Sequence, residues 1–545
     1  MEQSYFTMEG DIAVPTEAGL EYLAKITTDP KGQVYAFTRD AEPLMVAGAM
    51  ARLSRTGDDM RMVVLKEFAG RAPEALNGLF RRVITGYGDD SVQQLMPMSL
   101  VVESCSNLMT KLLERGRLKA YLEQSTRYIY FDAKVYDRNG ELVYRYYIPM
   151  YFPEPLRNRY RADMDHIFAL YSKVVRELST FVRERKVPFQ TSETDDAKIK
   201  AARTAWMGAT RAQACDAARN MLPVATTSTV GIVGSAQSFD TLIMRLASLE
   251  LPEAQELSER LLGEVRKVAP QFFERTDIPE RGGATINHRR QIIQNVRAYA
   301  LEHLSPEEVV ASGMEINLVD YYPKDELSVI CDLLWNGSGE SYESIARQVA
   351  GLGEEGLVKI LQAGIGERYN RRHRPGRSFE FAHFKWECKT DYGIFRDLQR
   401  HRLVDGLDWQ DLTPFLGYEV PPLVVEAGLE GVFREAFEAS ERLYREVSSS
   451  GFKQEAQYTT LLGHHMRWRL AMNVRESFHF HEIRTGLDGH PGYRKAVKLM
   501  NRKFGDVYPR IGSAMKFVDT REDPELTRIA GELATQAKLA LLTGD

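Results

Sequence analysis

The two halves of this 545-residue chain carry the same landmarks in the same order, and this repeat constrains the fold more than any other feature. Early in each half an apolar helical pattern ends in small, polar and acidic residues, at positions 42–60 (EPLMVAGAMARLSRTGDDM) and 325–343 (DELSVICDLLWNGSGESYE). Later in each half a helical pattern ends in an Arg-x-Arg sequence, at positions 115–117 and 400–402. The repeated order predicts two related domains.

A third landmark completes the repeat. Each half has a small polar cluster that leads into a helix, at positions 234–246 (GSAQSFDTLIMRL) and 472–484 (MNVRESFHFHEIR). A single hydrophobic core stops growing at roughly 250 to 300 residues, so two diverged copies of a domain of ~220 to 300 residues fit the chain length. We place the copies at residues 1–300 and 323–545, with a linker at 301–322 where charged, irregular sequence replaces the periodicity. The alternative is a chance likeness among unrelated helices.

Most of the chain reads as helix, because apolar residues recur three and four positions apart with charged residues between them. Two segments differ. Residues 127–150 are rich in Tyr, Val and Ile around an Asn139-Gly140 turn, which predicts a β-hairpin. Residues 380–390 alternate apolar and polar side chains, as a strand does. These patterns alone indicate a mixed, mostly helical protein.

Composition excludes several classes of protein. Hydrophobic residues make up 43% and charged residues 27% of the chain, as in folded globular proteins. The net charge of -5 disfavours a dedicated nucleic-acid binder, which usually carries an excess of Lys and Arg. We expect no membrane span and no export signal, since the N-terminus carries acidic residues and the apolar runs are short. The four scattered cysteines predict reduced thiols in a cytoplasmic protein.

Arginines gather in the second half. Eight lie in one short stretch, namely Arg368, Arg371, Arg372, Arg374, Arg377, Arg396, Arg400 and Arg402. The guanidinium group binds phosphate in a bidentate manner, so the stretch suggests a nucleotide or pyrophosphate ligand, with His401 placed to contact a ring. The alternative is a solvated, ion-paired surface.

A second candidate site follows the first Arg-x-Arg sequence. If residues 123–128 are extended, Glu123, Ser125 and Arg127 share one face, which brings together an acceptor, a hydroxyl and a guanidinium. Such a set can bind the base, sugar and phosphate of a nucleotide. An exposed polar strand face is the common alternative.

Residues 115–128, RGRLKAYLEQSTRY, resemble the signature of flavin-dependent thymidylate synthases, in which RHR is followed by seven residues, Ser, one residue, Arg and Tyr. The segment AARNMLP around Arg219 resembles that family's phosphate-binding segment. In the second half, RHR is intact at 400–402, and MNVRESFHFHEIR at 472–484 resembles the family's late helix. The resemblance covers most of both halves and is therefore to a tandem duplication.

The resemblance implies a role for each matched residue. It implies that the pyrimidine nucleotide is bound by Glu123, Ser125, Arg127, Tyr128, Arg219 and Arg484. Of these, Arg484 would polarise the pyrimidine and Ser125 would lie beside it, without an assignment as nucleophile. It implies that the flavin is bound by Arg400, His401, Arg402, Asn473, Arg475 and His479, with Arg115 and Arg117 at the matching positions of the first copy.

Each copy departs from the family pattern on a different side. The first has Gly116 for the motif His, Asp89 and Leu95 for two further histidines, and Ser235 and Gln237 for the late Asn and Arg, so its flavin side is eroded. The second lacks Ser-x-Arg-Tyr after RHR and has Gln457 near the place of the phosphate Arg, so its nucleotide side is eroded. Complementary losses predict sites that draw on both copies.

The resemblance implies a helix-rich α+β fold with a central, largely antiparallel sheet in each copy. It implies reductive methylation of dUMP to dTMP with FAD as cofactor and NADPH and methylenetetrahydrofolate as co-substrates. Because family sites lie between subunits of a tetramer, it also implies a homodimer that forms a pseudo-tetramer. The alternatives are C5 methylation or hydroxymethylation of another pyrimidine nucleotide, and a non-catalytic flavin- or nucleotide-binding protein. The histidine spacing shows no metal-binding motif, and we expect no metal.

Overall fold

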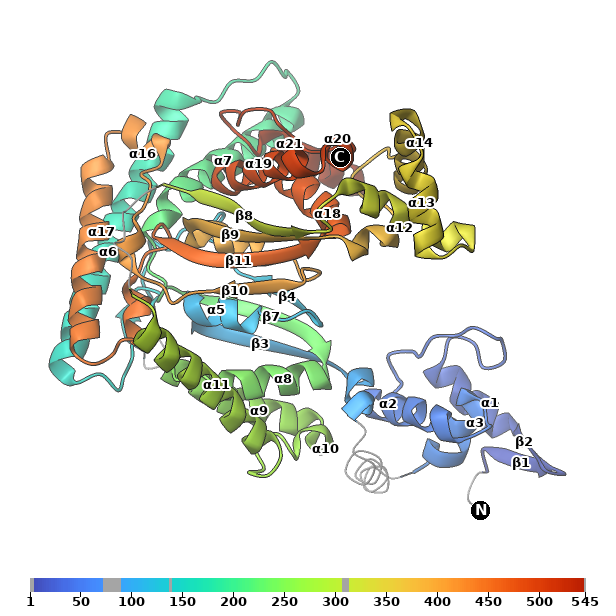
Figure 1. Cartoon of the computed structure of the whole chain (residues 1–545). Coiled ribbons are helices and arrows are strands. Elements are labelled where there is room, and N and C mark those ends of the chain that lie inside the picture. The colour runs from blue at the N-terminus through green and yellow to red at the C-terminus, as the bar shows by residue number, and fades with distance from the viewer. Residues whose placement is uncertain (1–3, 72–89, 137–139, 306–312, 544–545) are drawn as a thin grey trace. The chain divides into compact units, whose positions relative to one another are not determined.

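The computed structural model describes residues 4–71, 90–136, 140–305 and 313–543 and has an α+β fold (Figure 1). The chain forms two compact units. The first consists of Met1–Val102, Leu118–Leu122 and Val230–Pro306, and the second of Glu103–Arg117, Glu123–Thr229 and Glu307–Asp545. The second unit therefore contains parts of both sequence halves.

The first unit begins with an antiparallel hairpin of β1 (Phe6–Glu9) and β2 (Ile12–Pro15). Short helices follow, namely α1 (Glu17–Ile26), α2 (Pro43–Arg52) and α3 (Met60–Val63). A later group of helices consists of α8 (Ala236–Ala247), α9 (Pro252–Val268), α10 (Pro270–Phe273) and α11 (Gly282–His303). Of these, α8 packs against α9 and α11.

Two larger sheets carry the repeat. One has the strand order β3 (Pro97–Ser106), β7 (Thr227–Ser235) and β4 (Lys119–Glu123). The other is antiparallel, with the order β10 (Gly406–Trp409), β11 (His465–Asn473), β9 (His383–Asp391) and β8 (Glu315–Tyr322). Its central pair is in continuous register from His465 opposite Asp391 to Asn473 opposite His383.

Corresponding strands lead into corresponding helices. Strand β3 enters α5 (Asn107–Leu113), and β9 enters α15 (Tyr392–Leu398); both helices have seven residues. Ser106 and Asp391 cap the two helices by accepting a backbone N–H, which satisfies a donor that the first turn leaves open. Each Arg-x-Arg sequence begins two residues after its helix ends, so the helix fixes where the arginines emerge.

The second landmark repeats in the same way. Strand β7 leads into α8 through the cap Ser235, and β11 leads into α18 (Val474–Arg484) through the cap Asn473. Each is followed by a 17-residue helix that begins with proline, α9 in the first copy and α19 (Pro491–Val507) in the second, and by a short helix, α20 (Pro509–Ser513) in the second. The structure confirms the predicted α+β fold with two domain copies.

The other α-helices of the described residues belong to the second unit. They are α6 (Glu154–Phe181), α7 (Asp196–Ala218), α12 (Glu326–Ser338), α13 (Tyr342–Ala350), α14 (Glu354–Ile365), α16 (Pro422–Glu426), α17 (Glu430–Ser449) and α21 (Ile529–Thr543). The long helices α6 and α17 lie side by side, as Figure 1 shows, and α7 packs against α21. Helices α18 and α19 pack against the four-stranded sheet.

A local two-fold pairing joins the copies within the second unit. The Leu462 N–H donates to the Leu222 carbonyl at 2.8 Å, and the Val224 N–H donates to the Thr460 carbonyl at 2.7 Å. The two segments have equivalent positions in their copies, because Arg219 and Gln457 each lie eight residues before the strand that follows. Each copy therefore donates the equivalent backbone hydrogen bond to the other. This reciprocity is the pattern of an isologous interface.

Two segments differ in detail from the sequence interpretation. The expected linker at 301–322 includes β8, which pairs with β9 along the edge of the four-stranded sheet. The predicted hairpin at 127–150 is short, with β5 (Val135–Tyr136) antiparallel to β6 (Leu142–Val143). Its Asn139 lies outside the described residues, and the predicted strand at 380–390 corresponds to β9.

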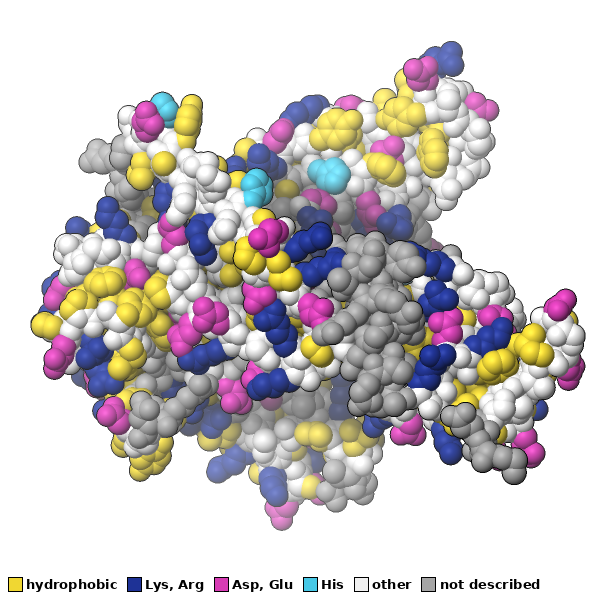
Figure 2. All heavy atoms as spheres, turned by 90° about the horizontal axis from the view of Figure 1, so that it is seen from below, with side chains coloured by type: hydrophobic (Ala, Val, Ile, Leu, Met, Phe, Trp, Pro, Cys, Tyr) yellow, Lys and Arg dark blue, Asp and Glu magenta, His cyan; other side chains and the backbone are white. Residues whose placement is uncertain are grey.

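The surface and the cysteines agree with the composition. On the described residues of the face in Figure 2, Lys and Arg side chains are interspersed with Asp and Glu side chains. All four cysteines are buried free thiols. Among the described residues, no helix combines the length and the apolar character that a membrane span requires.

The two-fold pairing leads to a stability prediction at Gly463. A Cβ atom there would lie 2.8 Å from the Asn220 Cβ and 2.9 Å from the Asn220 carbonyl oxygen, which belongs to the backbone of the other copy. We expect Gly463→Ala to destabilise the protein by about 1 to 3 kcal/mol through overpacking, measured as a lower urea midpoint. Gly431→Ala in α17 is the control, because a Cβ there meets nothing within 4 Å. Equal midpoints for the two variants would contradict the prediction.

Candidate functional site

A buried carboxylate lies where the two copies meet. Glu123, at the end of β4, accepts from Arg396 Nη2 at 2.8 Å through one oxygen and from Lys111 Nζ at 2.9 Å through the other. Lys111 and Arg396 are the fifth residues of α5 and α15, so the two copies supply equivalent cations. Burial alone would raise the pKa of Glu123, but the charges of Arg396 and Lys111 hold it well below its ordinary value.

The first arginine of each Arg-x-Arg sequence lies beside an acid of the other copy. Arg115 Nη2 lies 3.1 Å from Asp408 Oδ1, and Arg400 Nη2 lies 3.6 Å from Glu123 Oε2. Each acid stands eight residues after the arginine of its own copy, so the two pairs are related by the same repeat. Arg117 donates to the Asp405 carbonyl of the second copy, whereas the Arg402 side chain is exposed in the turn after α15.

Both predicted phosphate arginines are held by carboxylates. Arg127 donates from Nε and Nη2 to the two oxygens of Asp216, each at 2.7 Å. Arg219 Nη1 donates to Asp397 Oδ2 of the second copy at 3.0 Å. Burial would raise the pKa of Asp397, but Arg219 and Arg127 hold it well below its ordinary value. Arg219 is 2% exposed, and its Nε and Nη2 have no hydrogen-bond partner in the described part of the chain.

Arg484 approaches from the second copy. It ends α18, and its Nε donates to His401 Nε2 at 2.8 Å. Its guanidinium carbon lies 5.6 Å from the centre of the Tyr493 ring, and the Arg127 guanidinium carbon lies 5.8 Å from the same ring. The structure thus brings to one ring the two arginines that the family resemblance assigns to the pyrimidine and the phosphate. His490 also lies here, with its Nε2 3.2 Å from the Asp216 carbonyl oxygen.

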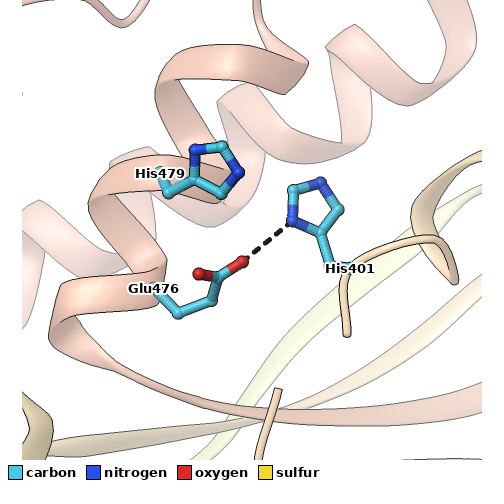
Figure 3. Close-up of side chains that lie close together, drawn as sticks. All are labelled: His401, Glu476 and His479. Atoms are coloured by element: carbon cyan, nitrogen blue, oxygen red, sulfur yellow. Dashed lines mark hydrogen bonds and ion pairs between the residues drawn. The ribbon is translucent and has the colours of Figure 1, made fainter. Parts of the chain in front are cut away.

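His401 links Arg484 to a buried acid, Glu476. Figure 3 shows His401, Glu476 and His479 close together, with the His401–Glu476 hydrogen bond as a dashed line. Because His401 Nε2 accepts from Arg484, its Nδ1 carries the proton and donates to Glu476 Oε1 at 2.9 Å. The ligand atoms of His401, Glu476 and His479 lie within 4.8 Å of one another, which is close enough for a metal ion. However, both His401 nitrogens are engaged, and the charges of Arg374 and Arg484, which together with burial lower the pKa of His479 to about 4, would repel a cation. The arrangement favours a chain of hydrogen bonds that orients Arg484.

The other predicted residues support the backbone around the site. Ser125 Oγ accepts from the Arg127 N–H at 3.2 Å and so stabilises the turn that carries Arg127. Asn473 Oδ1 caps α18 by accepting from the Glu476 N–H at 2.8 Å. Arg475 Nε donates to the Pro375 carbonyl at 2.9 Å. Tyr128 is 45% exposed.

The equivalent position of the second copy has different chemistry. Leu412 stands ten residues after Arg402, as Arg127 stands ten residues after Arg117. The Leu412 N–H donates to Gln457 Oε1 at 2.9 Å, so an amide and a backbone group replace the two guanidinium groups there.

Of the departures in the first copy, Leu95 ends a 3-10 helix of the first unit and is 40% exposed, and Asp89 lies outside the described residues.

Several site residues were not foreseen from the sequence, namely Lys111, Asp216, Asp397, Glu476, His490 and Tyr493. For Asp397 a signal was present, because an acid one turn before Arg400 on an apolar helix is out of place unless it is paired. Lys111 also had a local signal, since Glu114 lies three residues after it and pairs with it. Glu476, His490 and Tyr493 contact residues that are distant in sequence.

Two segments of the chain, residues 33–271 and 318–510, match the family model of the thymidylate synthase complementing proteins. The chain belongs to this family, that of the flavin-dependent thymidylate synthases. One matching segment begins in each half, as the tandem duplication predicts.

Curated relatives match over nearly their whole length. A UPF0159 protein of Chlamydia muridarum is 28% identical over 535 residues, which cover 95% of this chain and 98% of the relative. A UPF0159 protein of Chlamydia pneumoniae is 30% identical over 509 residues, which cover 90% of this chain and 93% of the relative. Among solved structures, the UMP/dUMP methylase PolB from Streptomyces cacaoi, bound with 5-Br dUMP, has 18% identity and a TM-score of 0.32, covering 39% of this chain and 98% of that chain.

Glu476 predicts a specific pH dependence. Burial raises the pKa of its carboxyl from 4.5 to about 7. The folded state thus favours the protonated acid, and this contribution to stability is full below pH 4.5 and is lost as the pH rises through 7. We expect the unfolding free energy of the wild type to fall by about 3 kcal/mol relative to Glu476→Gln over that interval, measured by urea unfolding at several pH values.

Glu438→Gln is the control for this series, because Glu438 is exposed on α17. It is expected to keep the wild-type pH dependence. If Glu476→Gln also kept that dependence, Glu476 would not be the titrating group.

Proposed function

We propose that the protein catalyses the reductive methylation of dUMP to dTMP, with FAD as cofactor, methylenetetrahydrofolate as carbon donor and NADPH as reductant. One observation carries the proposal. Arg127 and Arg219 of the first copy and Arg484 and His401 of the second lie in one network within one compact unit. The family resemblance assigns the three arginines to the nucleotide and His401 to the flavin.

The nucleotide side of the proposal depends on the donors that remain open. Arg127 is fixed by Asp216, but Nε and Nη2 of Arg219 have no partner among the described residues and can bind an anion. The negative charge that develops on a pyrimidine carbonyl oxygen is stabilised by a preorganised cation beside it. Arg484, held by His401, has this role in the proposal, and the polarised ring gains nucleophilic character at C5.

The donor set also fits an anionic dinucleotide such as FAD. The Arg400 side chain is 43% exposed beside the cross-copy pair, and Arg402 is exposed two residues later. Guanidinium groups bind phosphate in a bidentate manner, so this part of the site suits an anionic ligand. The charges of Arg371 and Arg374 reach His479, whose low pKa keeps it neutral at pH 7 and suited to contact with a ring. When bound, the flavin would supply the reducing equivalents.

The asymmetry of the copies predicts one nucleotide site per chain. Leu412 and Gln457 occupy the positions equivalent to Arg127 and Arg219, and the Leu412 N–H donates a hydrogen bond to the Gln457 side chain. We propose one flavin and one nucleotide per chain, and a cytoplasmic homodimer in which two chains form a pseudo-tetramer. Assignment of the copies to residues 1–300 and 323–545 is part of this proposal.

The test is tritium release from 5-labelled dUMP in the presence of methylenetetrahydrofolate and NADPH. The wild type is expected to purify yellow with one flavin per chain and to release tritium. Arg484→Gln should retain the flavin but lose about 100-fold or more in turnover, as loss of a preorganised charge does. Arg445→Gln, an exposed change on α17, is the matched control.

The assay also separates the alternatives. Turnover of UMP, CMP or dCMP in place of dUMP would assign the protein to another pyrimidine C5 methylase or hydroxymethylase. A yellow protein that neither oxidises NADPH nor releases tritium would be a non-catalytic flavin-binding protein, and the proposal would be wrong.

A further inference from the structure

The C-terminal segment returns to the first copy. The family match ends at residue 510, yet the chain continues to α21, which packs against α7 of the first copy. This approach is close, since a Cβ on Gly208 of α7 would lie 3.2 Å from the Glu532 carboxylate of α21. The segment is therefore docked beside the helix whose last turns carry Asp216 and precede Arg219.

The residue before α21 is an arginine whose charge is compensated only in part by an acid, Glu532. Arg528 is 8% exposed, and its guanidinium carbon lies 4.3 Å from the centre of the Tyr128 ring. Among the described residues, the Arg528 carbonyl accepts from the Glu532 N–H, but the guanidinium Nε is buried without a hydrogen-bond partner. Tyr128 belongs to the Ser-x-Arg-Tyr motif, so the C-terminal segment places an additional cation at the nucleotide motif.

Arg528 also lies near a second cation. Burial and the charge of Arg127 lower the pKa of Arg528 to about 9, and Glu532 compensates only in part. A buried cation without a partner costs several kcal/mol in general. A bound anion would remove this cost, because a phosphate accepts charge-assisted hydrogen bonds from more than one guanidinium.

We propose that Arg528 binds the phosphate monoester of the nucleotide and thereby completes the phosphate site of the first copy. The inference rests on the proposed function for the identity of the nucleotide. Arg127 has already given Nε and Nη2 to Asp216, so the phosphate needs further guanidinium groups with open donors. Among the described residues, Arg528 has a buried Nε without a partner, as Arg219 and Arg396 do. The sequence signature of the family does not include this residue, since it lies beyond both matching segments.

A purely structural role makes the opposite prediction for stability. If Arg528 served only to fasten α21 onto Tyr128, its removal would destabilise the protein without ligand. If Arg528 awaits an anion, Arg528→Gln removes a buried charge that is compensated only in part, and the ligand-free protein should melt at the same or a higher temperature.

The experiment compares the full-length wild type, Arg528→Gln, Arg528→Lys and the control Arg521→Gln, which changes an exposed arginine of the same segment. Binding of dUMP, deoxyuridine and inorganic phosphate is measured by calorimetry, and melting temperatures are recorded with and without each compound. We expect Arg528→Gln to weaken dUMP binding ~10-fold or more, as loss of a charge-assisted hydrogen bond does. Deoxyuridine binding should be unchanged, and Arg528→Lys should retain part of the dUMP affinity.

Two results would overturn the inference. One is dUMP binding by Arg528→Gln as tight as in the wild type and the control. The other is equal weakening of dUMP and deoxyuridine together with a lower melting temperature, which would assign Arg528 a packing role. If the wild type bound inorganic phosphate through Arg528 and failed to bind dUMP, that result would support the anion site and contradict the proposed function. If the wild type bound neither inorganic phosphate nor dUMP, the anion site and the proposed function would both be wrong.

Discussion

Glu123 is a carboxylate without contact to solvent, and it is shared by cations from both copies. Lys111 also pairs with the buried Glu114, whereas Arg396 has its ion pair with Glu123. Removal of Glu123 would leave the buried Arg396 without this carboxylate at a cost of several kcal/mol. The equivalent helices α5 and α15 must therefore stay in fixed relation, and with them the turns that carry Arg115 and Arg400. The geometry of Arg127, which follows Glu123 by four residues, depends on the same contact.

A symmetric scaffold here carries asymmetric chemistry. The backbone bonds of Leu222 and Val224 with Thr460 and Leu462 obey the local two-fold relation, and so do the caps and helix lengths. The side chains at the equivalent site positions do not, since guanidinium groups on one side correspond to Leu412 and Gln457 on the other. Duplication relaxes the constraint that identical subunits impose, because each copy needs to keep only the residues that one site uses.

The sequence predicted what depends on spacing along the chain. Helix periodicity, the repeated landmarks and the motif positions of Arg127, Arg219 and Arg484 could all be read locally. The pairing of these arginines with carboxylates could not, because Asp216 and Asp397 pair with residues 89 and 178 positions away. The sequence does not distinguish strand β8 from a linker. It is an edge strand with mostly exposed residues, so it lacks the apolar alternation of a buried strand.

The two-fold pairing of the segments around Leu222 and Leu462 occurs within one polypeptide. In a protein assembled from separate subunits, the equivalent contact weakens as the protein is diluted. Here its formation is unimolecular, with an effective local concentration on the order of millimolar for a flexible connection. The contacts between the two copies thus persist at any cellular abundance of the chain. Because both copies are translated from one messenger RNA, they are always present in a one-to-one ratio.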